Sequence, residues 1–301
     1  MMWLTSNRRS GFIDLQRRVL WLASLVLCGC TTVPAAPPSA LGLDPFYRSY
    51  LAAEGIPIIA SAKVPQEALL AARDMAQGMI AHRPDLARWL AANDYRIALI
   101  AEDEALLDLP ELRDWKKPAR DDVRLTRCEL KHYDVRIGAL SDRAYWNARA
   151  RGTGGRHMVG SEEDVLGLPT TRYWGETIFV HEFAHQILDA VRHTDLPLYA
   201  EIESAYADAK AAGRFQNEYT MTTADEYWAE GTQFWFNSNR LQVFGGRRIL
   251  NHTDLAEYDP ALYAALGRVY GDNHQLKSDP FYMHSGRVPP GPPPENTAEV
   301  C

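Results

Sequence analysis

Two histidines and a glutamate in one short segment give the strongest chemical signal in the sequence. The segment reads His181-Glu182-Phe183-Ala184-His185. In a helix, its two imidazoles lie one turn apart on the same face and can reach one zinc ion, while Glu182 points at a water bound to that ion. The alternative is a surface helix with two solvated histidines. The flanking residues 178–180 and 187–188 are apolar, which favours a buried helix whose histidines need partners. We therefore predict a zinc hydrolase of the metallopeptidase class, with one Zn²⁺ per chain.

A catalytic zinc site needs a third protein ligand and an open position for water. Glu226 and Glu230 lie one turn apart on a helix predicted from about residue 223 to residue 239, among aromatic residues. Two acidic side chains in aromatic surroundings indicate a nearby cation, and the alternative is a solvated acidic stripe. We assign Glu226 to the zinc and expect Glu230 to accept the free ring N–H of a ligand histidine.

Glu226 has one competing use, as part of a helix cap. Thr223 with Glu226 fits a capping box, in which a glutamate that reaches back to cap its own helix could not also face a metal. Thr222 with Asp225 offers an equivalent cap one residue earlier. We predict that this earlier pair caps the helix and leaves Glu226 for the zinc.

The two motifs together, His181–His185 and Glu226-Tyr227-Trp228-Ala229-Glu230, resemble the anthrax-lethal-factor-like zinc metallopeptidases. The resemblance covers about residues 173–240 and implies a zincin-like (gluzincin) catalytic domain whose third zinc ligand is the first Glu of the Glu-x-x-x-Glu pair. It also implies that a tyrosine seven residues before that Glu, here Tyr219, faces the metal. We expect Tyr219 to donate a hydrogen bond to the developing oxyanion, and the alternative is a core aromatic residue. The N-terminal half resembles no family.

The motifs specify a metal and a water but not the acyl group that is cleaved. A peptide or protein substrate is expected. The alternatives are a zinc hydrolase that acts on a cell-wall crosslink or another amide, a lipoprotein that keeps the fold without catalysis, and a metal-free helical domain. The formal net charge of −7 disfavours nucleic acid as a partner.

The N-terminal residues have the pattern of an export signal. Basic residues precede a short apolar run over 19–27, which is too short to span a bilayer. Leu27-Cys28-Gly29-Cys30 resembles the bacterial lipobox, which implies removal of residues 1–29 and acylation of the Cys30 sulfur. The alternative is an ordinary secretory signal. We expect a protein attached to the membrane of the bacterial cell envelope by this lipid, and Thr31 favours the outer membrane.

One folded domain, residues 42–285, is expected between a Pro/Ala tether at 30–41 and a Pro-rich tail at 286–301. Its composition, 46% hydrophobic and 24% charged residues in the whole chain, is typical of globular proteins. The predicted fold class is α+β and mainly helical, with a mixed N-terminal part (42–150) and a catalytic part (151–285).

Two cysteines, Cys128 and Cys301, remain once the signal peptide and the lipid anchor are accounted for. In an oxidising compartment they are expected to form a disulfide, and the alternative is two free thiols.

Apolar periodicity predicts the elements that position the motifs. Helices are expected over 66–82, 84–92, 198–212 and 260–270, and strands over 95–100 and 135–138. The glycines at 152–155 lack the lysine of a phosphate loop, so we reject nucleotide binding and expect a close approach of the backbone. Residues 157–159 are expected to be an edge strand that holds the substrate backbone, or else a connecting loop. This makes His157 the one further histidine associated with the site.

Overall fold

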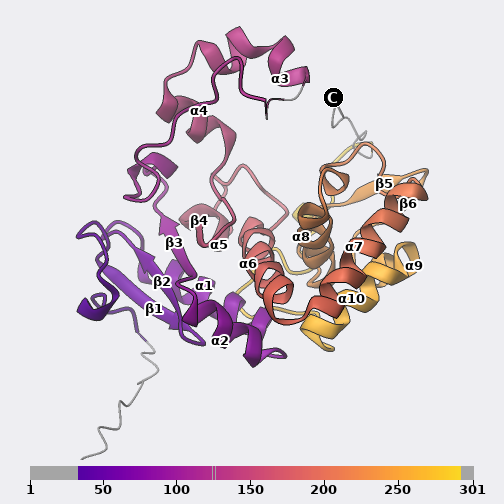
Figure 1. Ribbon diagram of the computed structural model, residues 1–301, viewed down its shortest axis with the longest axis horizontal. Coiled ribbons are helices and arrows are strands. Elements are labelled where there is room, and N and C mark those ends of the chain that lie inside the picture. The colour runs from indigo at the N-terminus through magenta and orange to yellow at the C-terminus, as the bar shows by residue number, and fades with distance from the viewer. Residues whose placement is uncertain (1–32, 124, 126, 293–301) are drawn as a thin grey trace, which may run out of the picture. The chain divides into compact units, whose positions relative to one another are not determined.

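The computed structural model describes residues 33–292, apart from 124 and 126 (Figure 1). The predicted signal peptide, Cys30 and Cys301 lie outside the described residues, as does the side chain of Cys128. Lipidation of Cys30 and the Cys128–Cys301 disulfide therefore stay predictions. Within the described part of the chain, none of the helices has the length and apolar character needed to cross a bilayer.

The described chain is mainly helical, with a small mixed sheet (Figure 1). The strands are β1 (Ser49–Ala53), β2 (Ile56–Ala60), β3 (Arg96–Ile100), β4 (His157–Ser161), β5 (Gln242–Phe244) and β6 (Arg247–Ile249). The α-helices of the first half are α1 (Gln66–Ile80), α2 (Pro84–Ala92), α3 (Arg127–Lys131), α4 (Asp142–Arg149) and α5 (Glu162–Val165). Those of the second half are α6 (Ile178–Thr194), α7 (Leu196–Ala211), α8 (Ala224–Trp235), α9 (His252–Tyr258) and α10 (Pro260–Tyr270). The predicted α+β, mainly helical fold class is confirmed.

The sheet has the order β1-β2-β3-β4, in which β1 and β2 are antiparallel and the other pairs are parallel. Strand β3 is apolar on both faces. Ile97 and Leu99 belong to the main core together with residues of α1, α2 and α6, whereas Ala98 and Ile100 belong to a smaller core on the other face. Burial on both faces explains why this parallel strand reads as a continuous apolar run.

The free side of β4 is covered by the glycine-rich segment before it. Thr153 donates its N–H to Val159 O (3.1 Å) and accepts from Val159 N–H (2.9 Å), so residues 151–155 run antiparallel to β4. Strand β4 is the last strand in the sheet order, so the predicted edge strand at residues 157–159 is confirmed. The outer backbone groups of Val159 are already bonded to Thr153, however, so they are not free to hold a substrate. We call residues 151–155, which cover this side of β4, the edge segment.

Two buried polar side chains fix this edge segment. Arg151 donates from Nε and Nη2 to both carboxylate oxygens of Glu163 in α5, at 2.6 and 3.1 Å. Gln186 of α6 donates to Gly155 O (2.8 Å) and to Arg96 O (3.0 Å). The edge is thus held both to the sheet and to helix α6.

The strand predicted at 135–138 is wrong, because the structure has a π-helix at Asp134–Gly138. Val135 is 80% exposed, and only Ile137 packs inward, against Tyr133 and Tyr145. One buried residue does not define a strand face, and so short an apolar run does not distinguish helix from strand.

Both ends of the described chain lie against the domain. Ala35, in the predicted tether, exchanges two backbone hydrogen bonds with Tyr50 of β1, at 3.0 and 2.8 Å. Arg287, in the predicted tail, is only 1% exposed. These residues are therefore part of the fold.

The first turn of helix α6 is capped by a carboxylate from α5. Asp164 accepts the N–H groups of Ile178 (3.2 Å) and Phe179 (2.8 Å), two of the first donors of α6 that have no partner within the helix. Burial nevertheless dominates and raises the pKa of Asp164 to about 8, although these hydrogen bonds lower it.

Asp164 should therefore impose a pH dependence on stability. Its pKa in the folded state lies above that of about 3.9 in an unfolded chain, so its stabilising contribution is complete below about pH 4 and is lost as the pH rises through about 8. We expect the free energy of unfolding of Asp164→Asn to fall less between pH 5 and pH 8 than that of the wild type. Urea denaturation of the metal-free proteins measures this, with the exposed Asp121→Asn as control. Equal slopes in Asp164→Asn and the wild type would contradict the assignment.

Candidate metal centre

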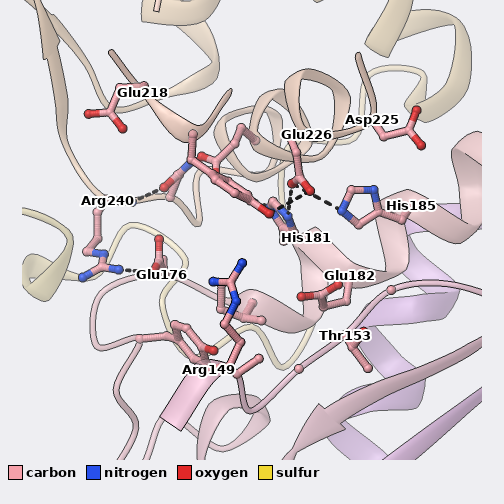
Figure 2. Close-up of a pocket in the computed structure, with 18 of the residues that line it drawn as sticks. Arg149, Thr153, Glu176, His181, Glu182, His185, Glu218, Asp225, Glu226 and Arg240 are labelled. Atoms are coloured by element: carbon pink, nitrogen blue, oxygen red, sulfur yellow. Dashed lines mark hydrogen bonds and ion pairs between the residues drawn. The ribbon is translucent and has the colours of Figure 1, made fainter. Parts of the chain in front are cut away.

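The structure brings His181, His185 and Glu226 together, although Glu226 is far from the histidines in sequence. Glu226 Oε2 lies 2.9 Å from His181 Nε2 and 3.6 Å from His185 Nε2. One donor atom from each residue lies within 4.8 Å of the other two, which is close enough to hold one metal ion. Figure 2 shows the carboxylate of Glu226, from α8, facing both imidazoles of α6.

Gln233 determines which ring nitrogen of His181 faces the other metal-ligand residues. The Gln233 amide donates from Nε2 to Thr177 O (3.1 Å), and since a carbonyl can only accept, this contact fixes which end of the amide is nitrogen. Gln233 Oε1 then accepts from His181 Nδ1 (3.1 Å). The other ring nitrogen, Nε2, then faces Glu226 Oε2 at 2.9 Å, and it can bind a metal ion when it carries no proton.

The charges around these residues favour a cation. Burial opposes the charged form of His181, but the hydrogen bond with Glu226 and the charges of Glu182, Glu230 and Glu226 outweigh it and raise the pKa of His181 to about 10. Burial also opposes the charged form of Glu226, yet its hydrogen bond with His181 and the nearby imidazole of His185 hold its pKa well below the usual range. Two imidazole nitrogens and a carboxylate oxygen, in a site rich in carboxylates, fit a zinc ion that keeps an open position.

Glu182 lies beside the metal-ligand group without being part of it. Burial raises the pKa of its carboxyl group, and the neighbouring His181 and His185 oppose this. The edge segment passes directly over it. A Cβ atom at Gly154 would lie 3.3 Å from Glu182 Oε2 and 3.1 Å from His185 Cδ2. The expected close approach of the backbone at these glycines is thus confirmed.

Tyr219 reaches the same carboxylate from a separate segment, a 3-10 turn at Tyr219–Met221. Its hydroxyl donates to Glu226 Oε1 (2.9 Å). The residue is 48% exposed, so it is not a core aromatic residue. Burial of the hydroxyl and the charge of Glu226 raise its pKa, which keeps the phenol protonated and able to donate.

The cap of α8 differs from the prediction. Thr223, not Thr222, is the N-cap, and its hydroxyl accepts the Glu226 N–H (3.1 Å). Thr222 Oγ1 donates instead to Tyr219 O (2.7 Å). The two roles of Glu226 do not conflict, because the cap uses only its backbone while its side chain turns to the histidines.

Glu230 lies near His181 but does not hold its ring. Glu230 Oε1 is 3.6 Å from His181 Nδ1, beyond hydrogen-bond distance, and Glu230 Oε2 accepts from Asn239 (2.8 Å) and Gln242 (3.3 Å). The residue that pairs with the ring is Gln233, which the sequence analysis missed. Its signal was present, because positions 226, 230 and 233 share one face of a helix.

His157 lies outside the metal-ligand group. Its Nε2 is 3.5 Å from Asp94 Oδ2, at the start of β4. His157 is not among the residues that line the cavity over the metal-ligand group, so the structure does not support its association with the substrate.

A cavity of about 1000 Å³ opens over the metal-ligand group. Its lining includes Gly152–Gly155 of the edge segment, together with His181, Glu182, Tyr219 and Glu226. Arg149, at the end of α4, and Arg240 also line it, and Arg240 pairs with Glu176 (Figure 2). The metal-ligand group and Glu182 thus face one open cavity.

Comparisons with known proteins add little at the level of sequence. No family model matches the chain. No curated protein matches it. Among solved structures, the Pro-Pro endopeptidase of Paenibacillus alvei matches with 14% sequence identity and a TM-score of 0.43, over 70% of this chain and 96% of that one. Such a similarity is too low for residue roles to be transferred between the two proteins.

Metal content should separate the ligands from their neighbours. We expect purified wild type to hold one zinc ion per chain by elemental analysis, Glu226→Ala to lose it, and Glu230→Ala to keep it. Gln233→Leu should bind zinc about 10- to 100-fold more weakly, because the His181 ring loses its partner. Loss of zinc from Glu230→Ala but not from Glu226→Ala would reverse our assignment.

Proposed function

We propose that the protein is a zinc-dependent metallopeptidase that hydrolyses peptide bonds. The observation that carries this proposal is the convergence of His181, His185 and Glu226 within 4.8 Å, with Glu182 and Tyr219 at the same cavity. Three protein ligands with an open position are typical of catalytic rather than structural zinc sites.

The side chains around the metal-ligand group have distinct tasks. A bound zinc would polarise the scissile carbonyl and lower the pKa of a water molecule. Glu182 takes a proton from the attacking water on a carboxylate oxygen and delivers it to the nitrogen of the leaving amine. Its raised pKa makes it a better base than an exposed carboxylate. The Tyr219 hydroxyl turns from Glu226 Oε1 and donates a hydrogen bond to the carbonyl oxygen as negative charge develops there.

The edge segment is suited to holding the substrate backbone. The N–H and C=O of Thr153 face β4, because they bond to Val159. In an extended chain the polar groups of successive residues alternate in direction, so those of Gly152 and Gly154 face the cavity that these residues line. A peptide can therefore pair with Gly152 and Gly154 as an added strand, beside Glu182.

A lipid anchor on Cys30 is part of the same proposal. It rests on the lipobox-like residues 27–30 alone. It would confine peptide hydrolysis to the surface of a membrane in the bacterial cell envelope.

Glu182→Gln tests the catalytic role most directly. The amide cannot take the proton from water, so we expect turnover of a fluorogenic peptide to fall by at least two orders of magnitude. Zinc content should remain at one per chain, because Glu182 is not a ligand. Substantial residual cleavage by the zinc-loaded variant would disprove the base assignment.

Tyr219→Phe tests the hydrogen bond to the oxyanion. We expect kcat to fall about 10²- to 10³-fold with little change in KM, because the hydroxyl acts on charge that develops in the transition state. Tyr133→Phe provides the control, because its hydroxyl also donates a hydrogen bond, to Pro118 O (2.8 Å), but lies outside the cavity. If kcat of Tyr219→Phe matched that of the wild type, Tyr219 would have no catalytic role.

A further inference from the structure

One wall of the cavity is apolar and exposed. It consists of Trp174, which precedes α6, and Val288, Pro289 and Pro290, which follow the last helical turn; together we call these the Trp174 wall. Trp174 is 42% exposed and Val288 is 40% exposed, whereas most large apolar side chains of the described residues are buried. Exposed apolar surface beside an active site commonly marks a binding surface.

The chain segment that leads into Val288 is held to the domain by a buried arginine. Arg287 donates from Nε to Asn239 O (2.7 Å), and its Nη groups donate to Asn251 Oδ1 (3.3 Å) and to Leu250 O. Its own carbonyl accepts from Leu241 N–H (2.8 Å). Val288 therefore leaves the core at a defined point on the rim of the cavity.

Trp174 is held in place against the same chain segment. Its ring makes edge-to-face contacts with Phe281 (5.3 Å between ring centroids) and with His284 (5.6 Å). A Cβ atom at Gly286 would lie 2.7 Å from Trp174 Nε1, so only glycine allows this contact without a shift. A Cβ atom at Gly175 would lie even closer to the backbone carbonyl oxygen of Gly286. The wall is a preorganised surface that joins two distant parts of the chain.

The groups of the Trp174 wall are suited to contact a side chain of the substrate rather than its backbone. Proline has no N–H group, so Pro289 and Pro290 cannot donate a backbone hydrogen bond to the substrate. The adjacent charges of Glu176 and Arg240 are paired with each other. What the wall offers is rigid apolar area, and an indole ring offers more of it than any other side chain.

We propose that the Trp174 wall is the subsite for one large apolar side chain of the substrate. The proposal rests on the proposed peptidase function and adds the class of residue that the site prefers. It uses surface that is continuous with the cavity over Glu182 and Tyr219. A substrate with leucine or phenylalanine at the position that meets the wall covers this surface, whereas alanine leaves it exposed to water.

The first experiment is a set of fluorogenic peptides that differ at one position at a time, with Ala, Leu, Phe, Lys or Asp on either side of the cleaved bond. In the wild type we expect Leu or Phe to exceed Ala by about tenfold or more in kcat/KM at one position, mainly through KM. This ratio should fall to near one in Trp174→Ala and be largely retained in Trp174→Phe. Leu196→Ala, which removes an exposed apolar side chain outside the cavity, should keep the wild-type ratio. A ratio that survives in Trp174→Ala would overturn the proposal.

A chain that ends at Arg287 tests the rest of the wall, because it keeps the buried anchor. The preference for Leu or Phe should decrease in this variant. If the truncated protein instead cleaved all peptides faster by the same factor, the segment after Arg287 would be an obstruction and not a subsite. Circular dichroism and zinc content verify that each variant is folded and loaded.

Binding separates this proposal from the peptidase function itself. Zinc-loaded Glu182→Gln should bind the Leu peptide about tenfold more tightly than the Ala peptide in calorimetry, and the added Trp174→Ala should remove the difference. If the wild type cleaves no peptide but this difference is found, the peptidase function is wrong and the apolar subsite stands. Equal binding of the two peptides by Glu182→Gln overturns the subsite.

Discussion

The carboxylate of Glu226 lies against two imidazoles because α6 and α8 pack in direct contact, and much of the fold serves that contact. Trp228 of α8 is buried and donates its indole N–H to Ala184 O of α6 (3.1 Å). Ala184 lies between His181 and His185 in the sequence, so this hydrogen bond joins the two helices at the level of the histidines. On the far side of α8, a Cβ atom at Gly231 would lie 2.7 Å from the Leu262 side chain, so α10 supports α8 closely. A small shift between these helices would separate the donor atoms, since they come from both.

The packing of α6 against α8 also brings several carboxylates close together. Glu182, Glu226 and Glu230 all act on His181, and this is why its pKa is raised although it is buried. Buried like charges are unfavourable unless a cation lies among them. The arrangement therefore favours metal binding over stability of the metal-free protein, a compromise often found at functional sites.

The metal-ligand group could be predicted from local spacing, because residues four apart along a helix lie on the same face. The same rule gave α1, α2, α7 and α10 close to their observed bounds, whereas α8 ends at Trp235, four residues before its predicted end. Features that depend on distant pairing could not be predicted. The pairing of residues 151–155 with Val159 of β4 is such a feature. The β1–β2 hairpin was missed for a local reason, because its turn uses Glu54 and Gly55 at positive φ rather than a typical Asn-Gly pair. Gln233 could have been predicted from local spacing, because it shares a helix face with Glu226 and Glu230. It was missed because the search for partners of the histidines considered only acidic side chains.

Gln233 also links the orientation of a metal ligand to the way a helix begins. Its amide is oriented by the carbonyl of Thr177, the residue immediately before α6, and in turn orients the ring of His181. When the first turn of α6 opens, the imidazole loses the partner that defines its tautomer. Local opening at this end of the helix would therefore weaken the binding of a metal ion by His181, and slower hydrogen exchange at the first amides of α6 would accompany tighter binding.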